Sequence, residues 1–355
     1  MAASLFDSTL YAKLFVTGDV GRLFTDSAEV RAMMIVEGAL AKVQGALGVI
    51  PSPSAAFLHR ASMEIQIDPS SLAEATGQNG VTVPGLVAAM RKHLEAPEHA
   101  QYLHWGATSQ DIMDTGLMLR LRQMLAQHDD ALAALLKALA SLADEHAETP
   151  MTARTYGQHA TPTSFGAVVA NWGAPLLSLR EELGALRAKG LWVQLAGAAG
   201  TGAALGATAA TQRQALAEAL GLHDPERSWH ADRSPILAIA SWVTRLAIAL
   251  GKMGDDLVLA TQSGIEEVLL GQSGGSSTMP QKQNPVVPSA ITALARHAIS
   301  LNASLQGAGM PRQERDGAAW FTEWLTLPEL CLTSSAALFK ARDLAQTLRP
   351  RPEIM

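Results

Sequence analysis

The residues best suited to chemistry lie in one segment, from Gly274 to Pro285, which reads Gly-Gly-Ser-Ser-Thr-Met-Pro-Gln-Lys-Gln-Asn-Pro. Its two glycines give the backbone freedom to move. Ser276 and Ser277 supply hydroxyl groups, and Lys282 carries a positive charge. The Asn-Pro pair at its end is typical of the start of a helix. The segment is therefore predicted to be a mobile loop that closes on an anion.

Two other stretches are also predicted to begin helices. Thr108 and Asp111 form the Thr-x-x-Asp pattern of a capping box just before an apolar run. Thr161–Pro162 places a proline where the first residue of a helix tolerates one, ahead of the apolar spacing that begins at Phe165. Each helix start exposes unpaired backbone amides and the positive end of a helix dipole. One such start is an ordinary cap, but three around one cleft would bind a polycarboxylate without requiring a basic protein.

The string Met-Pro-x-Lys-x-Asn-Pro from Met279 to Pro285 resembles the signature of the fumarase/aspartase superfamily of lyases and cycloisomerases. The stretches around Thr108 and Thr161 resemble the other two signature regions, and residues 194–201 resemble a further segment of the superfamily. The resemblance implies that the three regions meet in one cleft built from different subunits of a homotetramer. It also implies a small polycarboxylate substrate, with neither a cofactor nor a metal.

The same resemblance assigns carboxylate-binding roles. Thr108 and Ser109 correspond to hydroxyls that hold a substrate carboxylate, whereas Lys282 and Asn284 correspond to the pair that grips the carboxylate next to the acidic carbon. A hydrogen alpha to a carboxylate is very weakly acidic, because its removal places a second negative charge on the carboxylate oxygens. Preorganised donors and a cation stabilise that dianion, which is what this set of residues could provide.

Ser276 matches the serine that transfers the proton in the superfamily, and Ser277 is the neighbouring hydroxyl and the weaker candidate. A serine is a poor base at its ordinary pKa. Ser276 therefore needs Lys282, backbone amides and the exclusion of water before it can act. Closure of the loop would supply that environment.

Four further side chains are candidates for contact with the substrate, and each has a structural alternative: His104, His159, Arg154 and Arg233. The two histidines lie in segments that resemble signature regions and could donate to a carboxylate or shuttle a proton, although a lone histidine is often purely structural. The two arginines could bind a carboxylate or belong to internal ion pairs. The histidines lack the companions that a metal site needs.

Two positions depart from the fumarases and from the lyases that act on nucleotide and arginine adducts. Tyr156 stands where those enzymes usually have a His, and Ser289 stands where they have its Glu partner. That pair is associated with the proton of the leaving group. A carboxylate needs no such proton, because its conjugate acid has a pKa near ~4, whereas that of water is ~15.7. The double loss is expected of the branch in which a carboxylate adds to the carbon skeleton itself.

Residues 154–162 and 276–285 resemble the bacterial 3-carboxy-cis,cis-muconate cycloisomerases of that branch. The implied reaction, in the protocatechuate branch of the beta-ketoadipate pathway, converts a diene tricarboxylate to 4-carboxymuconolactone by carboxylate addition and protonation of the alpha carbon. One alternative is a beta-eliminating lyase of the superfamily that acts on adenylosuccinate or argininosuccinate and releases fumarate. Another is a non-catalytic helical scaffold.

Apolar residues recur at a spacing near 3.6 in several long stretches, and convincing strand alternation is almost absent. This pattern predicts an all-α fold with a bundle of long helices at its core. Residues 1–108 contain more helix breakers and are predicted to form a small N-terminal helical domain, followed by the bundle with the signature loop at 109–345 and a short tail at 346–355. Superfamily members usually carry another small helical domain after the bundle, and this chain is expected to lack it.

Composition excludes several classes of partner. The net charge of −6 argues against nucleic acid, and the single cysteine, Cys331, fits a reducing compartment such as the cytoplasm. The most apolar window, Ile236 to Leu250, is too short for a membrane span and contains Arg245. Charged residues make up only 17% of the chain, which predicts that an oligomer buries part of the surface.

Overall fold

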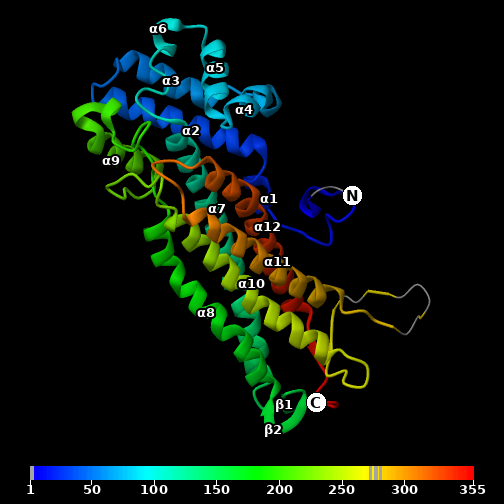
Figure 1. The fold of residues 1–355 in the computed structure, drawn as a ribbon. Helices are drawn as coiled ribbons and strands as arrows, with labels where there is room; N and C mark the ends of the chain where they lie inside the picture. The colour runs from blue at the N-terminus through cyan, green and yellow to red at the C-terminus, as the bar shows by residue number, and fades with distance from the viewer. Residues whose placement is uncertain (1–3, 272–273, 276–278, 280–281) are drawn as a thin grey trace.

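The computed structural model describes residues 4–271, 274–275, 279 and 282–355. Most of this part of the chain is helical, which confirms the predicted all-α fold (Figure 1). Six helices precede the long bundle: α1 (Val20–Leu23), α2 (Asp26–Ala46), α3 (Ser52–Glu64), α4 (Ala73–Asn79), α5 (Val83–Leu94) and α6 (Pro97–Ala100). The remaining six are α7 (Ser109–Glu145), α8 (Phe165–Gly190), α9 (Ala209–Leu220), α10 (Ser234–Ala260), α11 (Val286–Gln306) and α12 (Gly317–Thr347).

Short elements connect these helices. Four are 3-10 helices, at Leu5–Asp7, Pro69–Leu72, Ala203–Thr208 and Gly307–Gly309. The described strands are β1 (Pro150–Thr155), β2 (Gln158–Ser164), β3 (Val268–Leu269) and β4 (Arg349–Pro350). They pair as two antiparallel ribbons, β1 with β2 and β3 with β4.

The long helices α7, α8, α10, α11 and α12 lie alongside one another, and α2 to α6 gather at one end of this bundle (Figure 1). Helix α10 packs against α8, α11 and α12, so it occupies the centre. Its fully buried Trp242 donates an Nε1 hydrogen bond of 2.9 Å to the carbonyl oxygen of Leu179 on α8. The predicted bundle is confirmed, whereas the domain division at residue 108 stays a prediction.

Helix α10 is, by length and composition alone, apolar enough to cross a membrane. However, 61% of its most apolar stretch is buried inside the protein. A helix that is apolar on most of its faces is what the centre of a large bundle requires.

The helix start expected at Thr161–Pro162 is wrong. Both residues belong to β2, where Pro162 lies opposite Thr152, and α8 begins only at Phe165, with Ser164 as its N-cap. A proline is tolerated there because both strands of a two-stranded ribbon are edge strands. The hairpin turns at Tyr156 and Gly157, whose φ angles of 54° and 71° are those of a type I′ turn.

Candidate active site

The start of α7 is built around the buried carboxylate of Asp111. Its Oδ2 accepts a 3.0 Å hydrogen bond from the backbone N–H of Thr108, which confirms the predicted capping pattern. The same carboxylate accepts from the backbone N–H groups of Ala196 and Gly197, at 3.0 and 2.9 Å, and from His230 Nε2 at 2.9 Å. Asp111 therefore does more than cap a helix, because it ties the start of α7 to two distant loops.

Arg315 brings a cation to this helix start, and sequence reasoning missed it. Its Nε donates to Gln110 Oε1 at 2.9 Å, and its Nη2 donates to the carbonyl oxygen of Ala198 at 3.1 Å and to Thr108 Oγ1 at 3.4 Å. The sequence held a clue to this cation, because the next residue, Asp316, is the N-cap of α12. The start of α12 is thus one more helix start, besides those considered from the sequence. Arg315 places a positive charge beside a hydroxyl that was assigned to carboxylate binding.

His104 and Ser109 share a cavity of about 320 Å³, which Arg91 also lines. The ring of His104 is hydrogen-bonded to Glu37 on α2, with 2.6 Å between His104 Nδ1 and Glu37 Oε1. Burial alone would lower the pKa of His104, but the charge and hydrogen bond of Glu37, with the charge of Asp111, outweigh burial and the opposing charge of Arg91. The pKa of His104 therefore lies above its ordinary value.

Lys282 and Asn284 lie together at a second place, beside the start of α11. Gly274 and Asn284 form an antiparallel bridge with backbone hydrogen bonds of 3.0 and 2.8 Å, and α11 begins two residues later, as expected of the Asn-Pro pair. Lys282, Asn284 and Arg351 line a cavity of about 940 Å³. Arg351 is already paired with Glu266 and Glu353, and Glu266 lines the same cavity. This part of the chain can therefore present Lys282 and the amide of Asn284 to an anion. Ser276 and Ser277 lie outside the described residues.

The remaining predicted site residues are on or near the hairpin, or buried in the bundle. His159 is exposed on β2, and Arg154 on β1 makes a bidentate ion pair with Glu267, with contacts of 2.9 and 2.7 Å. Arg233 is 3% exposed and donates four hydrogen bonds of 2.6 to 3.0 Å, shared between two buried carboxylates, Asp114 and Glu323. The ion-pair alternative thus describes both arginines in the structure.

The three regions do not meet within one chain. Helix α7 has 37 residues, so its two ends lie about 55 Å apart at 1.5 Å per residue. Thr108 precedes its first residue, and the β1–β2 hairpin follows its last, at opposite ends of the bundle in Figure 1. Asn284 and Arg315 likewise flank α11, whose 21 residues span about 31 Å. The three groups of predicted site residues therefore do not all meet within one copy of the chain.

A comparison with known proteins identifies the family. The family model described as "Lyase" matches residues 22–300. The chain belongs to the fumarase/aspartase superfamily of lyases. It is 39% identical to 3-carboxy-cis,cis-muconate cycloisomerase of Pseudomonas aeruginosa over 344 residues, which cover 96% of this chain and 75% of the relative. It is 35% identical to nitrosuccinate lyase of Streptomyces davaonensis, with 96% and 75% covered.

A solved structure supports the same assignment. The crystal structure of 3-carboxy-cis,cis-muconate lactonizing enzyme from Pseudomonas putida superposes with a TM-score of 0.92 at 35% identity, covering 98% of this chain and 78% of that one. The fold of this superfamily member is therefore that of the lactonizing enzyme along nearly the whole of the described chain.

In this superfamily member, six of the predicted site residues fall into three groups. Thr108, Ser109 and His104 lie together at the start of α7, Lys282 and Asn284 lie at the start of α11, and His159 lies on the hairpin. No group of three or more His, Cys, Asp or Glu side chains that could hold a metal ion occurs among the described residues. The absence of a metal from the reaction stays a prediction.

Proposed function

We propose that this protein is a cofactor-independent cycloisomerase that converts 3-carboxy-cis,cis-muconate to 4-carboxymuconolactone. The observation that carries the proposal is its 35 to 39% identity, over 96% or more of its length, to four bacterial cycloisomerases of that name. The replacement of the proton-handling pair by Tyr156 and Ser289 supports it independently, because intramolecular addition of a carboxylate releases no group that needs a proton.

The reaction requires one new C–O bond and one new C–H bond. A substrate carboxylate attacks an alkene carbon, and the alkene electrons move to the neighbouring carbon and its carboxylate, which becomes a dianion. Lys282 and Asn284 stabilise that charge, and a proton passed by Ser276 to carbon completes the lactone. Thr108, Ser109 and Arg315 hold another carboxylate. The roles of Ser276 and of Ser277 beside it rest on sequence alone.

We further infer that neighbouring copies complete the active site in a homotetramer. The support is geometric, because within one chain the length of α7 places Thr108 about 55 Å from the hairpin, and the length of α11 places Asn284 about 31 Å from Arg315, which contacts Thr108. Light scattering during gel filtration tests this inference, with about four times the 37.4 kDa chain mass expected for the active species. An active monomer would contradict it. The cytoplasm is proposed as the compartment because the buried thiol of Cys331 is unpaired in the described chain.

The activity itself is tested by following the loss of diene absorbance when purified protein is mixed with 3-carboxy-cis,cis-muconate. Ser276→Ala is expected to lower kcat by about 100- to 10,000-fold while the circular dichroism spectrum stays unchanged, since general acid–base groups contribute this much. Ser300→Ala, an exposed serine on α11, is the matched control and is expected to keep full activity. Unchanged turnover in Ser276→Ala would remove that serine from the mechanism.

A beta-eliminating lyase is the second candidate, favoured by the 35% identity to nitrosuccinate lyase. It predicts release of fumarate from adenylosuccinate or argininosuccinate. Coupled detection of fumarate with those two compounds, run beside the diene assay, separates the two activities.

A further inference from the structure

Glu37 is a buried acid that none of the assigned roles uses. It lies on α2 in the N-terminal group of helices and is 1% exposed. Its Oε1 accepts from His104 Nδ1 at 2.6 Å, and its Oε2 is buried without a hydrogen-bond partner in the described part of the chain. A buried carboxylate is costly unless a cation faces it. The short contact therefore indicates an imidazolium at His104.

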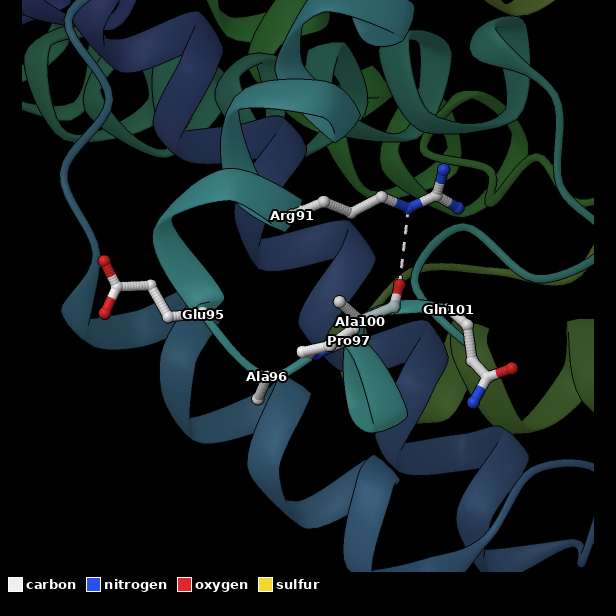
Figure 2. A pocket seen from close by; sticks show the side chains of 6 residues that line it. All are labelled: Arg91, Glu95, Ala96, Pro97, Ala100 and Gln101. Carbon is white, nitrogen blue, oxygen red and sulfur yellow. Dashed lines mark hydrogen bonds between the residues drawn. The ribbon is translucent and has the colours of Figure 1, made fainter.

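Hydrogen bonds from neighbouring helices hold the turn that carries His104 in an unusual backbone conformation. The φ angle of His104 is 64°, in the left-handed region that non-glycine residues seldom adopt. Arg91 on α5 donates Nε to the carbonyl oxygen of Ala100 at 3.3 Å, as Figure 2 shows, and Gln44 donates to that of Trp105 at 2.8 Å. Neighbouring helices thus fix the backbone on both sides of His104 and leave its ring against Glu37.

The other face of the ring looks onto a cavity beside the start of α7. His104, Arg91 and Ser109 all line this cavity of about 320 Å³, and the side chain of His104 is 19% exposed. Because Glu37 occupies Nδ1, Nε2 is the ring donor that remains for a ligand. Ser109 is the first residue of a 37-residue helix, so the positive end of its dipole favours the same kind of ligand, an anion.

We propose that Glu37 is a positioning residue that holds His104 as an imidazolium, so that Nε2–H of the ring binds one carboxylate of the tricarboxylate substrate beside Ser109. The proposal rests on the proposed function for the identity of that carboxylate. The charged groups around the ring are Glu37 on α2, Asp111 on α7 and Arg91 on α5. Of these, only Glu37 contacts it directly. Removing that one negative charge is therefore expected to let the ring lose its proton at lower pH.

The test is the pH dependence of kcat and KM for Glu37→Gln, which keeps the shape of the side chain and a hydrogen-bond acceptor. If the imidazolium binds substrate, kcat/KM falls as pH rises through the pKa of His104. In Glu37→Gln this fall is expected at least one pH unit lower, which makes kcat/KM about tenfold smaller on the alkaline side. The change is expected mainly in KM, because a carboxylate contact present in both the ground and transition states is uniform binding.

Matched variants separate positioning from a structural role. Asp26→Asn removes an exposed acid from the same helix and is expected to leave the profile unchanged. Glu37→Asp retains the charge and is expected to keep the fall near the wild-type pH. If Glu37→Gln does not fold, a His104 ring that titrates at or below 6.5 in the wild type would refute the proposal. A folded Glu37→Gln protein with the wild-type pH profile would overturn the proposal, as would a loss of kcat that does not vary with pH.

A second readout does not need the substrate. In ligand-free protein with ¹⁵N-labelled histidine, the His104 resonance, assigned by its loss in His104→Asn, is expected to titrate above 6.5 in the wild type and lower in Glu37→Gln. If the wild type does not consume 3-carboxy-cis,cis-muconate, the proposed function is refuted, and this titration still decides whether Glu37 maintains the imidazolium. An identical titration in the two proteins would refute that role.

Discussion

Arg233 is the residue whose replacement is expected to reveal most about how the bundle is held together. It lies just before α10 and joins Asp114 on α7 to Glu323 on α12, both at most 2% exposed, through four hydrogen bonds. Arg233→Met fills much of the same space but leaves two buried carboxylates facing each other. Breaking one buried pair costs about 3–5 kcal/mol, and two carboxylates place the expected loss near the upper end, about 5 kcal/mol.

Thermal unfolding followed by fluorescence measures this loss. With an unfolding entropy of about 2.1 cal/mol/K per residue, a 355-residue chain is expected to melt about 7 °C lower. Arg245→Met is the control, because Arg245 pairs with Glu182 on the surface, where such pairs contribute at most about 1 kcal/mol. Its melting temperature is expected to fall by about 1 °C or less.

The two buried carboxylates also predict a pH dependence of the loss and a rescue by further substitutions. Burial raises the pKa of Glu323 even with Arg233 present, and the charge of Asp114 raises it further. A carboxyl group with a raised folded pKa stabilises the fold below its unfolded pKa and loses that effect as pH rises through the folded pKa. The deficit of Arg233→Met is therefore expected to be smaller at pH 5 than at pH 8, and Asp114→Asn with Glu323→Gln is expected to recover most of it. A deficit equal to that of Arg245→Met would refute the argument.

Two further predictions concern stability. Burial lowers the pKa of His128 to about 4. In the unfolded chain the pKa of this histidine is near ~6.5, so the unfolded state binds a proton at a higher pH than the folded state does. About 3 kcal/mol of folding stability is therefore lost as pH falls from about 6.5 to 4. Denaturant titrations across this range should show that slope reduced in His128→Gln, and an equal slope would contradict it. Gly166→Ala places a Cβ 2.3 Å from the carbonyl oxygen of Ala143 and is expected to destabilise by about 1–3 kcal/mol. Gly184→Ala on the same helix meets nothing within 4 Å and is expected to stabilise by about 0.5–1 kcal/mol; denaturant midpoints that rank these two variants in the opposite order would show the packing argument to be wrong.

The long helices were predictable because their signal is local. The apolar spacing from Ile236 onward corresponds to α10, and the caps at Thr108 and at Asn284–Pro285 correspond to the starts of α7 and α11. Each of these features depends on residues within one or two turns of one another. The hairpin at Tyr156–Gly157 was missed because Thr161–Pro162 has the local pattern of a helix start, and the turn geometry that overrides it is visible only in the backbone angles.

The supports of the candidate site could not be predicted in the same way. Glu37 and His104 are 67 residues apart, and Arg233 is 119 residues from Asp114. No periodicity or spacing rule connects such partners, because their meeting depends on how whole helices pack. The sequence therefore indicated which side chains could contact the substrate. Only the packing of the helices shows that Glu37 contacts one of these side chains, His104, and that Arg233 belongs to a buried ion-pair network.

The four donors on Asp111 also set an order for biosynthesis. Its loop partners come 85 residues later in the chain, and His230 comes 119 residues later. At roughly 5–20 residues per second, translation leaves this carboxylate without its full set of donors for about 6–24 s, until His230 has been made. The nascent chain can form helices during that interval, but the hydrogen bonds that join the start of α7 to the two loops are not yet complete. A nascent chain stalled before residue 230 is therefore expected not to bind the substrate.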